Sequence, residues 1–250
     1  MSAMEINFEG KTAIVTGAAN GIGREIAAQF AVSGAKVAVV DLNIDGAKAA
    51  AQEIGSNALP VHCNVSDSDS VSEMVKTVAD AFGGINILVN NAGICERISV
   101  LDLTEEQWDR TMAVNLKGAF LVSKAAIPYM KAQDCARIIN TSSVSGKIGG
   151  LMVGLHYTAS KGGVLAMTKG LARELAPFNI TVNSVCPAMV DTEMGSMFEA
   201  DEKENYLRSV PLRRLASVGD VAAAVLYLAS DAASYVTGEV FDVNGGILMD

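Results

Sequence analysis

The sequence predicts an α/β fold in which a seven-stranded, mainly parallel sheet is doubly wound, with helices on both faces. Short runs rich in Val and Ile alternate along the chain with amphipathic segments of helix length, which is the pattern of repeated βαβ units. Most of the short runs are apolar without strict alternation, as expected of strands that are covered on both faces. The 250 residues contain no repeat or linker, so a single domain spanning 1–250 is expected.

The expected strands are taken in chain order. They cover residues 12–16, 36–41, 58–64, 86–90, 137–141, 181–186 and 239–243. The helix expected over 21–33 stops at Gly34, and the helix over 68–82 stops before two glycines. Thr104 opens a further helix, because a Gln three residues later completes a capping box. Ligands of such a sheet bind in the crevice beyond the carboxyl ends of its strands.

Composition and charge exclude several classes of protein. Apolar residues make up 50% of the chain and charged residues 19%, which is unlike a disordered protein. The net charge of −9 argues against nucleic acids and anionic membranes as partners. The longest stretch without a charged side chain, 175–190, is interrupted by prolines and asparagines, so no transmembrane helix is expected. No signal peptide is recognisable, and a cytoplasmic location is therefore expected.

The cysteines and histidines show no metal-binding or disulfide pattern. They are Cys63, Cys95, Cys135, Cys186, His62 and His156. The cysteines lie far apart and form no CxxC pair, so neither a zinc site nor a disulfide framework is predicted. The cysteines are therefore expected to be free thiols, buried or lining a site, in a reducing compartment.

A glycine-rich loop follows the first expected strand. It reads Thr-Gly-Ala-Ala-Asn-Gly-Ile-Gly over residues 16–23 and leads into a helix. Gly17 allows a tight turn, Gly21 removes a side chain that would block a pyrophosphate, and Gly23 lets the helix pack on the sheet. The loop therefore predicts a dinucleotide site in a Rossmann-type fold. Glycines also occur in plain turns, so the position after the first strand is what carries this interpretation.

Asp41 ends the second expected strand, about 20 residues beyond the glycine loop. A carboxylate there accepts hydrogen bonds from both hydroxyls of a ribose diol and repels the 2′-phosphate of NADP. Neither Asn20 nor Leu42 offers a cation that would attract that phosphate. Together with the loop, Asp41 favours NAD over NADP, whereas alone it could be a solvated residue.

Tyr157 and Lys161 are separated by four residues on an expected helix and therefore share one face. A nearby ammonium favours the phenolate, which brings the phenol toward the working range of a general acid or base. A serine at the adjacent strand end, within Asn140-Thr141-Ser142-Ser143, can hold a carbonyl or alcohol oxygen for that phenol. Alone, a Tyr and a Lys at this spacing are common by chance, so the combination carries the interpretation.

These motifs together resemble the short-chain dehydrogenase/reductase family, in its single-domain branch of about 250 residues. The resemblance spans residues 11–246 in the family's order. Besides the glycine loop and the Tyr/Lys pair, the matching segments are 64–65, 90–93, 114–115, 183–187 and 242–246.

The resemblance implies roles for individual residues. It makes Tyr157 the catalytic acid/base, Lys161 a ligand of the nicotinamide ribose that lowers the Tyr pKa, Ser143 the residue that orients substrate, and Asn115 the support of a proton-relay water. The implied cofactor-binding residues are Gly17, Asn20, Gly21, Ile22, Gly23, Asp41, Asn64, Val65, Asn91, Ala92, Gly93, Tyr157, Lys161, Pro187, Val190 and Thr192. The resemblance also implies that helices around 104–131 and 156–176 pair between subunits, with a homotetramer as the common assembly.

Two positions depart from the family's pattern. Asn64 stands where Asp is common, and its carbonyl oxygen is expected to keep a contact with the adenine amino group. Ala188 replaces the glycine of a Pro-Gly turn near the nicotinamide, which could alter the space for substrate slightly. Loss of activity is not expected from either.

The predicted function is NAD-dependent, metal-free interconversion of a secondary alcohol and a ketone by hydride transfer. One alternative is a 3-oxoacyl-[acyl-carrier-protein] reductase, which shares the motif order. Such reductases generally use NADPH and dock an acidic carrier, whereas this chain has Asp41, a net charge of −9 and one basic cluster at Arg208, Arg213 and Arg214. The other alternative is a non-catalytic dinucleotide-binding sensor, which would not need the complete catalytic set.

The expected substrate wall is mostly apolar and rich in Met, which favours a cyclic or otherwise hydrophobic hydroxy compound. Its candidates are Ser143, Val144, Leu151, Met152, Tyr157, Met189, Met194 and Met197, with Cys95, Ile148, Val153, Leu155, Phe198 and Tyr206 beside them. Any single Met could equally be core packing. Glu96 and Arg97 are read as solvated loop charges that could add a polar contact. The long segment 193–215 is expected to be a substrate-binding loop or lid, with a solvated excursion as the alternative.

Overall fold

The computed structural model describes residues 6–150, 152–192 and 198–249. Its sheet has seven strands, all parallel, in the order β3-β2-β1-β4-β5-β6-β7. The strands are β1 (Thr12–Thr16), β2 (Lys36–Asp41), β3 (Ala58–His62), β4 (Ile87–Asn90), β5 (Ala136–Thr141), β6 (Ile180–Pro187) and β7 (Val240–Val243). The predicted fold class is confirmed, and each predicted strand ends within two residues of the observed bounds.

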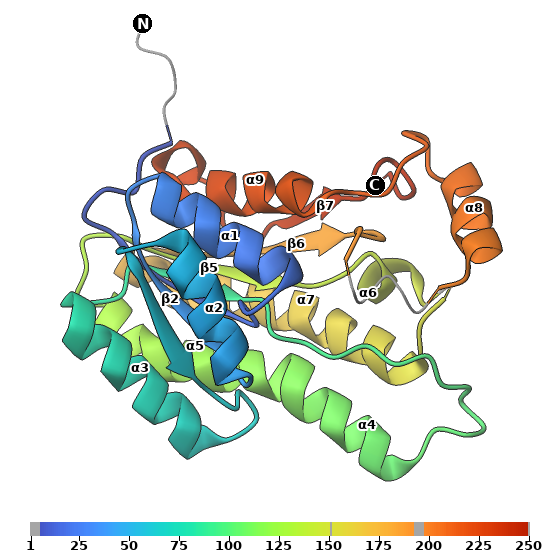
Figure 1. Ribbon diagram of the computed structural model, residues 1–250, viewed down its shortest axis with the longest axis horizontal. Helices are drawn as coiled ribbons and strands as arrows, with labels where there is room; N and C mark the ends of the chain where they lie inside the picture. The colour runs from blue at the N-terminus through green and yellow to red at the C-terminus, as the bar shows by residue number, and fades with distance from the viewer. Residues whose placement is uncertain (1–5, 151, 193–197, 250) are drawn as a thin grey trace, which may run out of the picture.

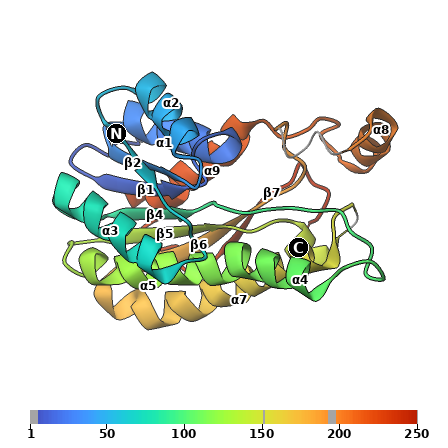
Figure 2. The ribbon, with the colours of Figure 1, turned by 60° about the horizontal axis from the view of Figure 1, so that its bottom comes forward.

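Helices cover both faces of the sheet. They are α1 (Gly21–Val32), α2 (Ile44–Ile54), α3 (Ser68–Phe82), α4 (Glu105–Met112), α5 (Gly118–Met130), α6 (Ser145–Ile148), α7 (Leu155–Leu175), α8 (Ala200–Ser209) and α9 (Val218–Ala229). In Figure 2, α1, α2 and α9 lie above the sheet and α3, α5 and α7 lie below it. A π-helical turn, Ala113–Lys117, joins α4 to α5, and no pattern in the sequence predicts it. None of the helices in the described ranges is both long and apolar enough to cross a membrane.

Local signals in the sequence explain where these helices begin and end. Asp67 caps α3 by accepting hydrogen bonds from two backbone N–H groups, and the helix ends at Gly83 in the left-handed conformation. Thr104 and Gln107 form the predicted capping box of α4.

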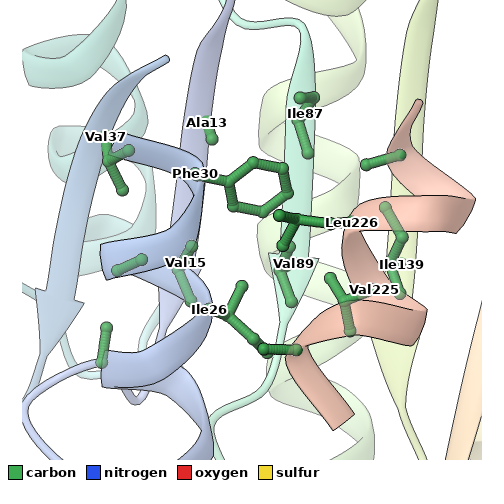
Figure 3. Close-up of a cluster of buried hydrophobic side chains, with 14 of the residues drawn as sticks. Ala13, Val15, Ile26, Phe30, Val37, Ile87, Val89, Ile139, Val225 and Leu226 are labelled. Carbon is green, nitrogen blue, oxygen red and sulfur yellow. The ribbon is translucent and has the colours of Figure 1, made fainter. Parts of the chain in front are cut away.

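The core consists of two apolar layers, one on each face of the sheet. In the layer shown in Figure 3, Ile26 and Phe30 of α1 meet Val225 and Leu226 of α9 over β1 and β4. Burial of each such large side chain contributes about 1.5–3 kcal/mol. Side chains of a strand point alternately to the two faces of the sheet, and helices cover both faces. The strands are therefore apolar throughout, as their sequence pattern predicts.

The order of the strands reverses between β1 and β4, which are neighbours at the centre of the sheet. The glycine loop leaves the end of β1, and residues 91–93 leave the end of β4. A crevice beyond these strand ends is the expected ligand site of an open α/β sheet. On the same side α8 stands away from the body (Figures 1 and 2), and none of its residues is buried.

Candidate functional site

The glycine loop is shaped for a ligand that approaches its backbone closely. Gly17 has a φ of 64°, and a Cβ there would lie 2.8 Å from the Cα of Ala92. A Cβ on Gly23 would lie 2.2 Å from the carbonyl oxygen of Gly17. Asn20, the N-cap of α1, makes no side-chain cap hydrogen bond among the described residues, so it leaves the first N–H groups of α1 uncapped. Such N–H groups can bind an anion.

Two side chains fasten the glycine loop to the segment after β4. The Thr16 hydroxyl accepts hydrogen bonds from the N–H groups of Asn91 and Ala92, at 3.0 and 3.1 Å. The Asn91 amide donates to the carbonyl oxygens of Thr16 and Gly17, both at 3.1 Å. The Asn91 side chain therefore holds the loop in place, a role that the sequence reading did not assign to it.

Asp41 lies at the edge of this crevice, at the end of β2. Its Oδ2 accepts the N–H of Ala19 at 3.0 Å, and its Oδ1 accepts the N–H of Asn43 at 2.9 Å. Each carboxylate oxygen keeps a lone pair for a further donor. This arrangement fits the ribose diol contact expected from the sequence.

Asn64 and Val65 follow β3 at the same edge of the sheet. The Oδ1 of Asn64 accepts the N–H and the hydroxyl of Ser66, at 3.1 and 2.8 Å. Since Ser66 already engages this oxygen, the expected adenine contact through it stays a prediction.

The predicted catalytic side chains meet where β5 and α7 come together. Lys161 Nζ donates to the carbonyl oxygen of Thr141 at 2.8 Å and lies 5.7 Å from the centre of the Tyr157 ring. The Ser142 hydroxyl donates to the Lys161 carbonyl oxygen at 2.8 Å, so Ser142 has a structural contact. Ser143 interacts with Tyr157, which supports the choice of Ser143 as the serine that faces the phenol.

Burial dominates the electrostatics of this group. Burial and the neighbouring Cys95 thiol raise the pKa of Tyr157 well above its usual value, and the Ser143 side chain opposes that rise. Burial lowers the pKa of Lys161 to about 8. Burial is the largest cause of the raised Tyr157 pKa, because it disfavours the phenolate, and the lowering of that pKa by the Lys161 ammonium stays a prediction.

Asn115 lies in the π-helical turn, a local geometry common at functional positions. Its amide group exchanges two hydrogen bonds with the backbone of Ile94, at 2.8 and 2.9 Å, and donates to the Ser160 hydroxyl at 3.1 Å. The turn therefore links the segment after β4 to α7. Support of a relay water by Asn115 stays a prediction.

The turn after β6 lies against the glycine loop. A Cβ on Gly21 would lie 3.6 Å from the Thr192 methyl group, which places the predicted nicotinamide turn against the predicted pyrophosphate loop. The Thr192 hydroxyl donates to the carbonyl oxygen of Val190 at 3.4 Å. Ala188 needs no left-handed conformation, since only Asn179 and Arg213 have positive φ among the described residues other than glycine. The missing glycine is therefore tolerated after Pro187.

The expected substrate wall is only partly within the described residues. Val144 and Phe198 are buried, and the N–H of Met189 donates to the Tyr206 hydroxyl at 3.0 Å. Ile148 and Leu155, in contrast, are exposed. Leu151, Met194 and Met197 lie outside the described residues. Within those that are described, no group of acidic, His and Cys side chains is arranged to hold a metal ion.

Comparison with known proteins gives consistent matches over nearly the whole chain. A family model described as enoyl-(acyl carrier protein) reductase matches residues 17–248. An uncharacterized short-chain type dehydrogenase/reductase of Sinorhizobium fredii is 43% identical, and the match covers 97% of this chain and 99% of that protein. A 3-oxoacyl-[acyl-carrier-protein] reductase of Vibrio cholerae is 40% identical over 98% of this chain and 100% of that protein.

Solved structures agree with this. A short-chain type dehydrogenase/reductase from Mycobacterium marinum is 37% identical, with a TM-score of 0.94 and 98% of both chains covered. A Brucella melitensis protein, titled a short-chain dehydrogenase/reductase of the glucose/ribitol dehydrogenase type, is 36% identical with a TM-score of 0.94, covering 99% of this chain and 100% of that one.

Proposed function

The chain belongs to the short-chain dehydrogenase/reductase family, whose oxidoreductases use a nicotinamide dinucleotide, and we propose that it is an NAD-dependent enzyme that interconverts a secondary alcohol and a ketone. One observation carries the proposal. Ser143, Tyr157 and Lys161 converge at the end of β5, on the side of the sheet that carries the glycine loop, where a Cβ on Gly17 or Gly23 would clash. A binding module without catalysis does not need this group.

The residues of the crevice fit a dinucleotide. A Cβ on Gly17 or Gly23 would fill the cradle at the start of α1, and the uncapped N–H groups of that helix suit a pyrophosphate. Asp41 would accept from the adenosine ribose, and Lys161 would bind the nicotinamide ribose. When bound, the cofactor supplies the hydride acceptor and a positive charge close to the phenol.

The chain's own side chains would then handle the alcohol and its proton. Ser143 orients the reacting oxygen by a hydrogen bond, and Tyr157 Oη takes the hydroxyl proton as general base. Lys161 keeps an ammonium beside a phenol whose ionisation burial strongly opposes. The site would align the alcohol with the base, which is the contribution the protein makes to such a reaction.

NAD is proposed over NADP because of Asp41. Its carboxylate is held by two backbone N–H groups at the end of β2, where we expect the ribose of the adenosine to bind. Repulsion between the two anions disfavours NADP. Apolar side chains such as Val144 and Phe198 support a cyclic or hydrophobic hydroxy compound as the substrate.

A 3-oxoacyl-[acyl-carrier-protein] reductase is the second candidate, because several similar proteins carry that name. Two of the three arginines that could dock an acidic carrier form ion pairs within the chain, whereas Arg213 donates to backbone carbonyl oxygens. Arg208 pairs with Glu204 at 2.9 Å, and Arg214 pairs with Asp220 at 2.6 Å. These ion pairs reduce the positive electrostatic potential that an acidic carrier protein would meet. A small-molecule alcohol is therefore favoured as the substrate.

The experiment that tests this function is a panel of secondary alcohols and ketones, assayed with NAD(H) and NADP(H) by absorbance at the reduced nicotinamide band. We expect turnover of cyclic or hydrophobic alcohols with NAD. Turnover restricted to NADPH and a 3-oxoacyl thioester on a carrier protein would select the second candidate. Dinucleotide binding without any turnover would select a sensor.

Assembly and domain organisation follow as lesser proposals. We infer a homotetramer in which α4, α5 and α7 pair between subunits, and Phe120 and Tyr129 leave apolar area exposed on that face. The chain is proposed to act as one domain, with 193–215 as its substrate-binding lid, and in the cytoplasm. Measurement of the native mass tests the assembly.

A further inference from the structure

Residues 95–97 send three consecutive side chains to three different parts of the site. The Cys95 thiol lies near Tyr157 and Lys161, and burial raises its pKa to about 11 while the Lys161 ammonium opposes that rise. The Arg97 guanidinium pairs with Glu202 of α8 at 2.6 Å. Glu96, between them, faces the first turn of α7. The loop charges that the sequence reading treated as solvated are therefore paired with other elements.

His156 lies in that first turn, directly before Tyr157, and is fully buried. Neither of its ring nitrogens has a hydrogen-bond partner among the described residues. Its Nε2 is 3.9 Å from Oε2 of Glu96, an atom that is also buried without a hydrogen bond among those residues. The other Glu96 oxygen lies 3.7 Å from the Arg110 guanidinium.

The backbone around His156 is shaped to the imidazole ring. A Cβ on Gly154 would lie 2.4 Å from Cε1 of the ring, so only glycine leaves room for it there. The N–H of Gly154 donates to the carbonyl oxygen of Glu96 at 3.0 Å. The start of α7 and the segment after β4 are thus fastened by a backbone hydrogen bond directly beside the Glu96 and His156 side chains.

Electrostatics favour a carboxylate at this place. The N-terminal turn of α7 carries partial positive charge, and Gly154 provides no side-chain cap. Glu96 supplies the negative charge that suits such a helix end. Buried polar atoms without partners are rare and unfavourable, and two of them, Nε2 of His156 and Oε2 of Glu96, lie 3.9 Å apart.

We propose that Glu96 and His156 are positioning residues for Tyr157, the imidazole Nε2–H donating to the Glu96 carboxylate so that the first turn of α7 stays fixed against residues 94–97. The catalytic consequence rests on the proposed function, because it concerns proton transfer by Tyr157. The two atoms are 3.9 Å apart, so this hydrogen bond requires them to approach by about 1 Å. This contact joins the two segments that carry Cys95 and Tyr157, since Cys95 directly precedes Glu96 and Tyr157 directly follows His156.

The test uses two variants at His156 and one control. His156→Leu removes the donor, whereas His156→Gln places an amide N–H donor on a side chain of similar reach. Arg110→Gln removes the other partner of Glu96 and leaves His156 in place. The first measurement, independent of turnover, is the rate at which iodoacetamide alkylates each cysteine, followed by mass spectrometry.

We expect His156→Leu to speed alkylation of Cys95 at least fivefold while buried Cys63 and Cys186 are unaffected. His156→Gln and Arg110→Gln should stay within twofold of wild type. Equal acceleration of all the buried cysteines would mean general destabilisation and would overturn the proposal, as would an unchanged rate at Cys95.

The second measurement is turnover of the best secondary alcohol of the panel, together with NADH binding by fluorescence. We expect kcat to fall at least tenfold in His156→Leu, whereas the NADH Kd and the number of NADH-binding sites stay unchanged. In His156→Gln, kcat should lie within threefold of the wild-type value. A fall in kcat that matches a loss of NADH sites, or a Gln variant as slow as Leu, contradicts positioning. If wild type oxidises no secondary alcohol, the proposed function is wrong, and so is the catalytic role of the Glu96–His156 contact. The alkylation rates of Cys95 still test whether that contact fixes the first turn of α7.

Discussion

Replacement of Lys161 by Met should stabilise the fold at neutral pH while removing activity. Lys161 is buried, and its pKa is lowered from 10.5 to about 8. Since a change of one in pKa corresponds to 1.36 kcal/mol, burial of the ammonium costs about 3 kcal/mol. Loss of the hydrogen bond to the Thr141 carbonyl oxygen offsets about 1–2 kcal/mol of the gain. A net stabilisation of about 1–2 kcal/mol is expected at pH 7.

The pH dependence gives this prediction its sign. Below pH 8 the ammonium is present in the folded and unfolded states, so wild type bears the full burial cost. Between pH 8 and 10.5 the unfolded state binds more protons than the folded state, and wild-type stability therefore rises with pH. Wild type should gain about 3 kcal/mol across that window, so the advantage of Lys161→Met at pH 7 should become a disadvantage of about 1–2 kcal/mol at pH 10.5.

Urea unfolding of both proteins at pH 7 and at pH 10.5, at one protein concentration, measures the difference. Lys169→Met, an exposed position on the same helix, serves as the control and should show no change of this kind. A difference between wild type and Lys161→Met that is independent of pH, or that grows toward pH 10.5, would refute the account of Lys161 as a buried ammonium.

Three further predictions concern the cofactor and the lid. Asp41→Ala should narrow the preference of kcat/KM for NAD over NADP, and an unchanged ratio would contradict the role of Asp41. Gly23→Ala should weaken NADH binding more than tenfold in fluorescence titration, because its Cβ would lie 2.2 Å from the Gly17 carbonyl oxygen; Gly170→Ala, with open space around it, should not. Hydrogen exchange should be faster in α8 than in α9 in the free protein and should slow in α8 with dinucleotide and alcohol bound; equal protection of α8 with and without ligands would exclude a lid.

The order of strands and helices could be predicted because each boundary has a local chemical cause. The strands β1 and β2 match their predicted bounds, since an apolar run ends at a glycine loop in one and at Asp41 in the other. The third strand was predicted too long. Its ladder stops at His62, and the N–H of Asn64 instead donates to the Ser70 hydroxyl. Pro60 is tolerated there because β3 is an edge strand.

Other features depend on contacts between distant segments and left no local pattern. The π-helical turn at Asn115 is accompanied by paired hydrogen bonds to Ile94, about 20 residues away in the chain. The Glu96–His156 pair joins side chains 60 residues apart. A single His beside Tyr157 has no spacing signal, so its burial against a carboxylate could be found only in the folded structure.

The central claim is that Tyr157 is the proton acceptor of an alcohol oxidation, and Tyr157→Phe tests it most directly. Only a hydroxyl is removed, so the fold and the NADH Kd should be unchanged. Turnover of the best secondary alcohol should fall by about 10²–10⁴, the usual contribution of a positioned general base. A variant that binds NADH normally and keeps more than about a tenth of wild-type turnover would contradict the mechanism.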